Sequence, residues 1–171
     1  MKEVATDMHS KIVRTRGGEV TIRPLRSGDT GPVAHVFERL GPESRRLRFG
    51  GGKKCLSGRE LELLATVDGR RHVLVGYAGG EPIGIARLAR DADDPTTAEV
   101  AFAVVDGWQG KGVGTVLMEA LAGDARAAGI RHLRASIVAE NKASLALMKH
   151  VTTIEHTTYA GTQLEVVGRA A

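Results

Sequence analysis

The stretch Gln109-Gly110-Lys111-Gly112-Val113-Gly114 decides the fold that this sequence predicts. It follows an apolar, strand-like segment at 98–105 and precedes a helix-like segment at 115–128. Its glycines remove side chains where a loop passes into a helix, and the first N–H groups of a helix lack internal partners and carry partial positive charge. The stretch therefore predicts a loop that holds phosphate groups with its backbone.

Two well-known phosphate loops do not fit this stretch. A Walker loop has Gly-Lys-Ser/Thr four residues after its first glycine, and a dinucleotide-binding loop has a third glycine three residues after the second. Neither spacing occurs between residues 109 and 116. Glycine-rich turns between a strand and a helix serve several nucleotides, so the flanking residues must identify the ligand.

Working outward from the loop, periodicity and turn residues predict alternating strands and helices. Strands are expected at 19–25, 72–78, 82–89, 97–105, 131–139, 151–159 and 163–167. Helices are expected at 31–40, in a short basic segment ending at 49, from a capping box formed by Ser57 and Glu60, and at 115–128 and 141–150. This order predicts a mixed α/β sheet covered by helices, in one domain from residue 18 to 171 after a polar, flexible segment at 1–17.

The composition limits the possible functions. A chain of 171 residues with 42% apolar and 26% charged residues is typical of one globular domain. The net charge of +4 is spread without a basic block, so no nucleic-acid partner is expected. No apolar run approaches membrane-spanning length, and the single cysteine, Cys55, excludes an internal disulfide and suits the cytoplasm. No His/Cys cluster has metal-ligand spacing, so no metal is expected. The oligomeric state stays open.

Three features together resemble the GNAT superfamily of N-acetyltransferases. Gln109 to Gly114 resembles the loop that binds the pyrophosphate of acetyl-CoA, and Glu99-Val100-Ala101-Phe102-Ala103-Val104 resembles the family's fourth strand. Asn141 matches the Asn that follows the fifth strand. The resemblance covers about residues 18–151. It implies a mixed, mostly antiparallel central sheet flanked by helices, with strands four and five splayed apart to form the cofactor cleft.

The resemblance also implies which residues bind acetyl-CoA. Backbone donation to phosphate is expected from Gly110 to Thr115, and a backbone N–H between Phe102 and Val104 is expected to stabilise the oxyanion. Gln109 would hydrogen-bond the loop or the pyrophosphate, Lys111 would add charge or be solvated, and Asn141 would fix the pantetheine arm, cap the next helix, or do both. The expected cofactor-binding residues are Phe102, Ala103, Val104, Gln109, Gly110, Lys111, Gly112, Val113, Gly114, Thr115 and Asn141.

Glu99 is the candidate catalytic residue. A lysine-type amine with a pKa of ~10.4 needs a base near neutral pH. Glu99 begins an apolar strand, where partial burial would make it a stronger base. The matching position in histone and bacterial protein lysine acetyltransferases is a catalytic Glu that works through water. The alternative is a strand-end Glu in a surface ion pair.

The sequence departs from the family pattern where many members have a tyrosine as general acid. Met148 stands at that position, seven residues after Asn141. A thiol with a pKa of ~8.5 leaves as thiolate with little help, and water, Tyr77 or Tyr159 remain as proton donors. Acetyl transfer through Cys55 is disfavoured because no His is placed to activate it. The Gly-Phe pair that often follows this helix is replaced by Thr152-Thr153, which leaves the shape of the C-terminal hairpin open.

The segment 42–49 suggests the acceptor. It resembles a segment that precedes the sheet in bacterial protein lysine acetyltransferases, which often acetylate acyl-CoA synthetases. We therefore expect a cytoplasmic, acetyl-CoA-dependent N-acetyltransferase that modifies a primary amine, with protein lysine favoured. Two alternatives remain open at this point: an acetyltransferase for a small-molecule amine, and a non-catalytic module that senses acetyl-CoA.

Overall fold

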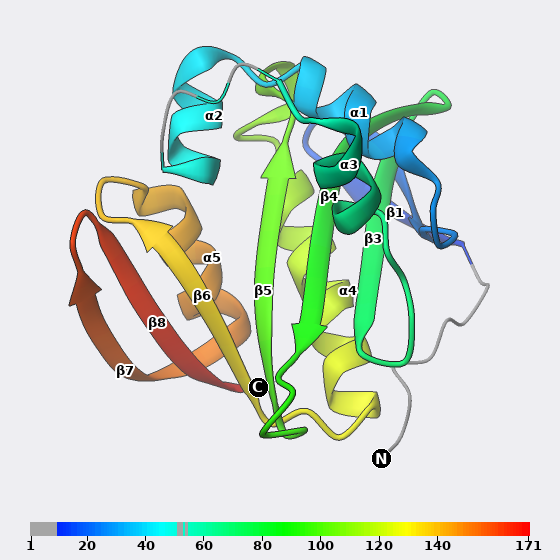
Figure 1. Ribbon diagram of the computed structural model, residues 1–171. Helices are drawn as coiled ribbons and strands as arrows, with labels where there is room; N and C mark the ends of the chain where they lie inside the picture. Colours follow the sequence, from blue (N-terminus) through cyan, green and yellow to red (C-terminus); the bar gives the residue numbers. More distant parts are fainter. Residues whose placement is uncertain (1–9, 51–52, 54) are drawn as a thin grey trace.

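The structure, a computed structural model, describes residues 10–50, 53 and 55–171. The expected flexibility of residues 1–9, and most of an expected turn at 50–54, therefore lie outside the described residues. Eight strands form one sheet in the order β1-β2-β3-β4-β5-β6-β8-β7 (Figure 1). Their bounds are β1 (Lys11–Thr15), β2 (Gly18–Pro24), β3 (Arg71–Ala78), β4 (Glu81–Arg90), β5 (Thr97–Val104), β6 (His132–Val138), β7 (Thr152–Ala160) and β8 (Gln163–Ala170).

One junction in the sheet differs from the others. All neighbouring strands are antiparallel except β5 and β6, which are parallel. These two strands pair over only three residue pairs, from Thr97–His132 to Glu99–Arg134, while β4 and β5 stay paired as far as Gly84–Val104. The upper halves of β5 and β6 therefore separate, as Figure 1 shows. This confirms the predicted mixed, mostly antiparallel sheet with its splay between the strands expected at 97–105 and 131–139.

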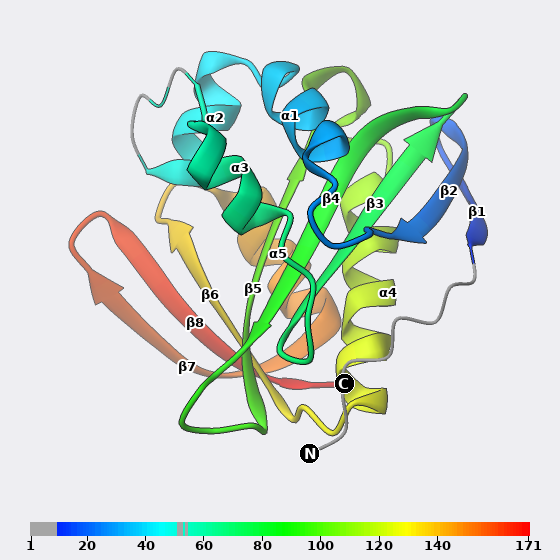
Figure 2. The same ribbon diagram turned by 45° about the vertical axis from the view of Figure 1, so that its right-hand side comes forward.

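Helices cover both faces of the sheet. α4 (Val113–Ala127) and α5 (Lys142–Val151) pack against each other and against one face, whereas α1 (Thr30–Glu38) and α3 (Gly58–Leu64) cover the other face over β3 and β4 (Figure 2). α2 (Pro42–Phe49) lies over the open end of the splay and contacts β6. A short 3-10 helix, η1 (Asp106–Trp108), links β5 to the glycine-rich loop.

Strand β1 was not predicted. Lys11–Thr15 pairs with β2 across a turn at Arg16 and Gly17, so the boundary placed at residue 17 falls inside a hairpin. Every side chain of β1 is exposed or only half buried, and such a strand has no apolar alternation to reveal it. The extra strand also shifts the count, so the predicted strands four and five are β5 and β6.

Local sequence signals explain the ends of the other elements. Ser57 accepts a hydrogen bond from Glu60 N while Glu60 bonds back to Ser57 N, which confirms the predicted capping box at α3. The hairpin of β7 and β8 forms even though Thr152 and Thr153 replace the usual pair: Thr152 is buried and donates to Met148 O at 2.6 Å, where α5 ends.

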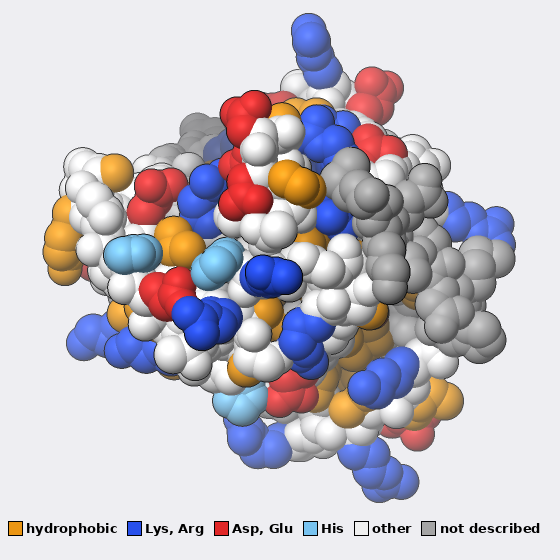
Figure 3. All heavy atoms as spheres, turned by 90° about the horizontal axis from the view of Figure 1, so that it is seen from below, with side chains coloured by type: hydrophobic (Ala, Val, Ile, Leu, Met, Phe, Trp, Pro, Cys, Tyr) orange, Lys and Arg blue, Asp and Glu red, His pale blue; other side chains and the backbone are white. Residues whose placement is uncertain are grey.

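The core lies between the sheet and its helices, with fully buried side chains such as Leu117, Leu121 and Leu133 between α4 and the sheet. At the end of the molecule opposite the splay, basic and acidic side chains are interspersed (Figure 3). Among the helices of the described chain, none is both long and apolar enough to cross a membrane.

Candidate active site

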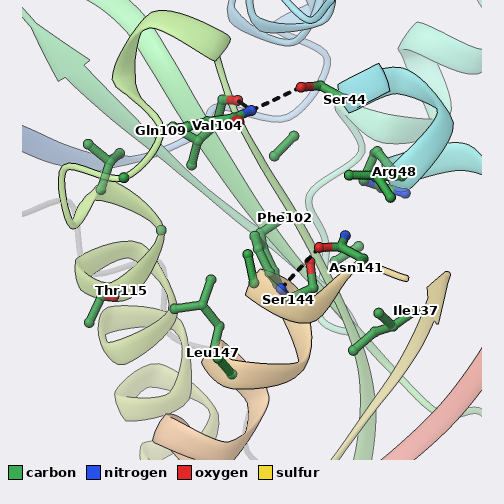
Figure 4. Close-up of a pocket in the computed structure, with 18 of the residues that line it drawn as sticks. Ser44, Arg48, Phe102, Val104, Gln109, Thr115, Ile137, Asn141, Ser144 and Leu147 are labelled. Atoms are coloured by element: carbon green, nitrogen blue, oxygen red, sulfur yellow. Dashed lines mark hydrogen bonds between the residues drawn. The ribbon is translucent and has the colours of Figure 1, made fainter. Parts of the chain in front are cut away.

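A cavity of about 530 Å³ opens where β5 and β6 separate. Its walls come from β5, β6, the loop before α4, and the helices α2, α4 and α5 (Figure 4). Residues from both faces of β5 line it, so the cavity passes through the plane of the sheet. Of the expected cofactor-binding residues, those that line it are Phe102, Ala103, Val104, Gln109, Gly110, Gly112, Val113, Gly114, Thr115 and Asn141.

The glycine-rich loop presents bare backbone to this cavity. Gly110 and Gly112 have left-handed φ values of 73° and 88°, which side-chain-bearing residues rarely adopt. Gly112 is the N-cap of α4 and supplies no capping side chain, and the first turn of α4 carries no acidic residue. The first N–H groups of α4 therefore meet no side-chain cap. At Gly114 a Cβ would lie 3.1 Å from Leu147 Cδ1, so this glycine lets α4 and α5 approach closely at the cavity wall.

Two basic residues lie beside the loop in different ways. Arg16 lines the cavity, and its Nη2 donates to Gly110 O at 3.1 Å while its backbone N donates to Lys111 O at 3.2 Å. Lys111 is not among the lining residues, and its Nζ lies 5.1 Å from the centre of the Trp108 ring. The sequence analysis missed Arg16, because it belongs to a turn 94 residues away from Gly110 in the chain.

A hydrogen-bonded cluster ties the loop to α2. Asp106 accepts from Gly41 N at 3.1 Å and from Ser44 Oγ at 2.7 Å. Gln109 Nε2 donates to Ser44 Oγ at 3.0 Å and to Val104 O at 2.9 Å, as Figure 4 shows. We call Gly41, Ser44, Asp106 and Gln109 the Asp106 cluster. The amide nitrogen of Gln109 is thus engaged with protein groups.

The backbone of β5 leaves groups directed at the gap. Val105 N donates to Ile83 O at 2.9 Å, so the backbone N–H of Val105 points toward β4. Hydrogen-bonding direction alternates along a strand, so the N–H groups of Phe102 and Val104 point toward β6. The pairing of β6 with β5 ends at Glu99, before these residues, so β6 does not bond to their N–H groups. Val104 O on that side accepts from Gln109. The gap therefore offers the N–H groups of Phe102 and Val104 as free donors on the cavity side of β5.

Glu99 lies just below the splay. Its side chain is 58% exposed, so the expected partial burial is wrong, and Glu99 is not among the residues that line the cavity. Its Oε2 lies 4.0 Å from Arg134 Nη2, the guanidinium that also pairs with Asp91 at 3.2 Å. Ala101, two residues further along the same face of β5, does line the cavity. Glu99 therefore stands at the outer edge of the site.

Two more arginines share that face of the sheet. Arg48 projects from α2 and lines the cavity, and Arg87 on β4 pairs in register with Ala101. Burial, reinforced by the positive charge of Arg87, lowers the pKa of Arg48 to about 10, and the negative charge of Glu99 opposes this shift. Burial also lowers the pKa of Arg87, again against the influence of Glu99. These two cations are partly desolvated.

Helix α5 forms the opposite wall. Asn141 is its N-cap, with Oδ1 accepting from Ser144 N at 3.1 Å, and both residues line the cavity. His150 also lines it and bonds Glu119 at 2.7 Å. Met148 is fully buried in the core and does not face the cavity.

The proton donors that the sequence left open lie elsewhere. Neither Tyr77 nor Tyr159 lines the cavity; burial raises the pKa of Tyr77, and Tyr159 is 74% exposed. Cys55 is exposed and also lies outside the lining residues. Within the described residues, no group of His, Cys, Asp or Glu is arranged to hold a metal ion.

The sequence has known relatives. Residues 43–151, more than half of the chain, match the model of the acetyltransferase (GNAT) family. Acetyltransferase Pat of Mycolicibacterium smegmatis is 34% identical over 140 residues, which cover 80% of this chain but only 42% of the relative. Acetyltransferase PA5475 of Pseudomonas aeruginosa is 33% identical over 132 residues, which cover 74% of this chain and 70% of the relative.

A solved structure has the same architecture. The GNAT domain of PAT from S. lividans superposes with a TM-score of 0.84 at 27% identity, over 94% of this chain and 96% of that one. The fold, the cavity at the splayed strands and the family match agree with one another. The chain belongs to the GNAT family of acetyltransferases, enzymes that take their acetyl group from acetyl-CoA.

Proposed function

We propose that this enzyme acetylates a lysine side chain of a protein by direct attack on acetyl-CoA, with Glu99 as general base. The likeness to the two acetyltransferases named Pat supports a protein acceptor, as does the resemblance of segment 42–49 noted above. An acyl-CoA synthetase is the protein class that this resemblance favours. The observation that carries the proposal is the cavity through the sheet, with an uncapped helix start on one side and Glu99 beside the other.

Binding of acetyl-CoA follows from charge and backbone geometry. The N–H groups at the start of α4 suit the pyrophosphate. All cationic lining side chains favour an anionic ligand, and no Asp or Glu is found among the described residues that line the cavity. Asn141 and the opposed walls of β5 and α5 would hold the pantetheine arm along the gap. The thioester carbonyl would then meet the N–H of Phe102 or Val104, and one such donor contributes about 3 kcal/mol to a transition state.

Glu99 would act through water. Two residues along a strand span roughly 6.7 Å, so one water molecule is about enough to connect Glu99 with the cavity edge at Ala101 by hydrogen bonds. In the reaction, the neutral amine nitrogen bonds to the carbonyl carbon, its proton passes through water to Glu99, and the carbon–sulfur bond breaks to release CoA thiolate. The exposure of Glu99 favours this relay, because solvent reaches the carboxylate.

Glu99→Gln tests the role of the base. We expect turnover to fall by about 10²-fold, because general-base catalysis typically contributes that much, while acetyl-CoA affinity stays unchanged. Glu19→Gln, at an exposed carboxylate on β2, is the matched control. Unchanged turnover of the Glu99 variant across pH would remove Glu99 from the mechanism.

The acceptor is tested separately. CoA release is measured against proteins, lysine peptides and small amines, and mass spectrometry locates the acetyl group. Modification of protein lysine supports the proposal. Turnover with small amines alone would make the enzyme a small-molecule acetyltransferase, and binding without CoA release for any amine would make it a sensor of acetyl-CoA.

A further inference from the structure

Arg48 and Arg87 lie on the same face of the sheet as Glu99. Each is partly buried, yet among the described carboxylates none lies within 4.0 Å of either guanidinium. Arg48 contacts the Phe49 ring at 4.8 Å, and Arg87 makes one long hydrogen bond, 3.4 Å, to Leu63 O. Arg87 Nε is buried without any hydrogen-bond partner. Two desolvated cations therefore lie close together with no described carboxylate within 4.0 Å, and the negative charge of Glu99 acts on both from a greater distance.

Two other arginines are paired with carboxylates. Arg39 pairs with Glu81 at 3.0 Å, and Arg134 with Asp91 at 3.2 Å. An unpaired charge costs more when it is buried than when it is exposed. Leaving these two desolvated guanidinium groups without a carboxylate partner is unfavourable for folding, as their lowered pKa values indicate. Such an arrangement is typical of a site that receives an anion from outside.

The position of the pair points to the acceptor rather than to the cofactor. Arg87 does not line the cavity beside the glycine-rich loop, and it lies on the Glu99 face of the sheet. Arg48 lies on α2, across the cavity from Thr115 (Figure 4). The phosphate-binding loop already has its own cation, Arg16. An acceptor amine approaching Glu99 passes these two charges, which repel its ammonium form unless the acceptor brings a negative charge.

We propose that the acceptor carries a carboxylate close to its reactive amine, and that Arg48 and Arg87 bind this carboxylate. This inference rests on the proposed acetyl transfer and narrows its substrate class. The carboxylate comes either from Asp or Glu beside a lysine in a protein or from a free amino acid. The two arginines also favour the neutral amine, which is the form that attacks.

Two matched peptides test the proposal in the full chain. In Gly-Glu-Lys-Glu-Gly the lysine has acidic neighbours, and in Gly-Gln-Lys-Gln-Gly it has neutral ones of similar size. A hydrogen-bonded charge pair is worth enough to predict at least about tenfold higher kcat/KM for the acidic peptide. Arg48→Gln with Arg87→Gln should reduce this ratio to within about twofold, and Arg87→Gln alone, at a residue outside the cavity lining, should lower the ratio with acetyl-CoA affinity unchanged. Arg39→Gln, at a paired surface arginine, should keep the ratio.

A second arm identifies the source of the carboxylate and does not depend on peptide turnover. Free L-glutamate and L-glutamine amide are offered as acceptors, and the acetyllysine forms of both peptides are titrated into the CoA complex by calorimetry. Equal kcat/KM for both peptides overturns the inference while leaving lysine acetylation intact. If no peptide reacts, the proposed protein acceptor fails. The inference then stands only if glutamate is acetylated in preference to glutamine amide, or if the acidic acetyllysine peptide binds more tightly than the neutral one and loses this advantage in the double arginine variant.

Discussion

Asp106→Ala should loosen the attachment of α2 to the loop that precedes α4. The carboxylate accepts one backbone and one hydroxyl hydrogen bond, from Gly41 N and Ser44 Oγ, and through Ser44 it supports Gln109. Hydrogen bonds to a charged group contribute about 1.5–3 kcal/mol each when buried. Asp106 is exposed, so solvent screening reduces the sum to about 1–2 kcal/mol of unfolding free energy.

Gly41 provides a second way to break the same cluster. A Cβ at residue 41 would overlap Asp106 Oδ2, and the nearest atoms it would meet all belong to Asp106. The φ of Gly41, −69°, suits alanine, so the backbone itself adds no strain. Gly41→Ala should therefore displace the carboxylate and destabilise the protein by about 1 kcal/mol. In the Asp106→Ala background the overlap is gone, and the same change should be nearly neutral.

Urea unfolding of the wild type, both single variants and the double variant measures this coupling. We expect an interaction energy of about 1 kcal/mol, because both changes remove the same two bonds. Ser44→Ala removes the bond to Asp106 and the bond from Gln109, so it should cost about as much as Asp106→Ala. The KM for acetyl-CoA should rise in all three single variants, since Gln109 loses support in each. Additive effects of Gly41→Ala and Asp106→Ala would refute the reasoning.

Three other predictions address the loop, the core and acid stability. Gly112→Ala forces alanine into φ 88° and should cost about 1–2 kcal/mol in unfolding and weaken acetyl-CoA binding; wild-type values in both assays would contradict this. Arg90→Met leaves two carbonyls unbonded, so urea unfolding should show a loss of at least about 2 kcal/mol, and a smaller loss would mean that the buried guanidinium contributes little. Hydrogen bonds from Thr96 and Thr97 lower the pKa of Asp94 to about 2. Its stabilising effect is thus present above about pH 3.8 and lost toward pH 2. Asp94→Asn should therefore reduce the change of the urea midpoint with pH over that range; an unchanged pH dependence of the midpoint would refute the assignment.

Helix caps and the glycine-rich loop could be predicted from the sequence, because each depends on nearby residues. The Ser57–Glu60 capping box, the Asn141 cap and the left-handed glycines of the loop depend on residues within a few positions of each other. The succession of strands and helices along the chain followed from periodicity, and the splayed sheet followed from the family resemblance. Strand β1 escaped prediction because it fully buries no apolar side chain: only Val13 packs in part against the core, beside the backbone pairing with β2.

The environment of Glu99 could not be predicted, because it depends on where two strands stop pairing. An apolar strand sequence predicts burial on both faces, and Val100 is indeed buried. The last residue pair between β5 and β6 is Glu99–Arg134, so the sheet begins to open beside this carboxylate and leaves it in solvent. Register between distant segments set this outcome, and no pattern within 97–104 encodes it.

The polar groups of the site also divide into those that a local motif supplies and those that distant segments bring. The backbone donors that we propose for phosphate arise from one short motif, whereas the cations around that motif come from segments far away in the chain. Arg16 arrives from the β1–β2 turn and Arg48 from α2, and the Asp106 cluster fixes α2 against the loop. The glycine-rich loop and α2 are therefore joined through Asp106 and through the bond between Gln109 and Ser44. It follows that a change at Asp106 should alter the binding of both substrates, whereas a change at Arg87, which lies outside the cavity, should alter the binding of the acceptor alone.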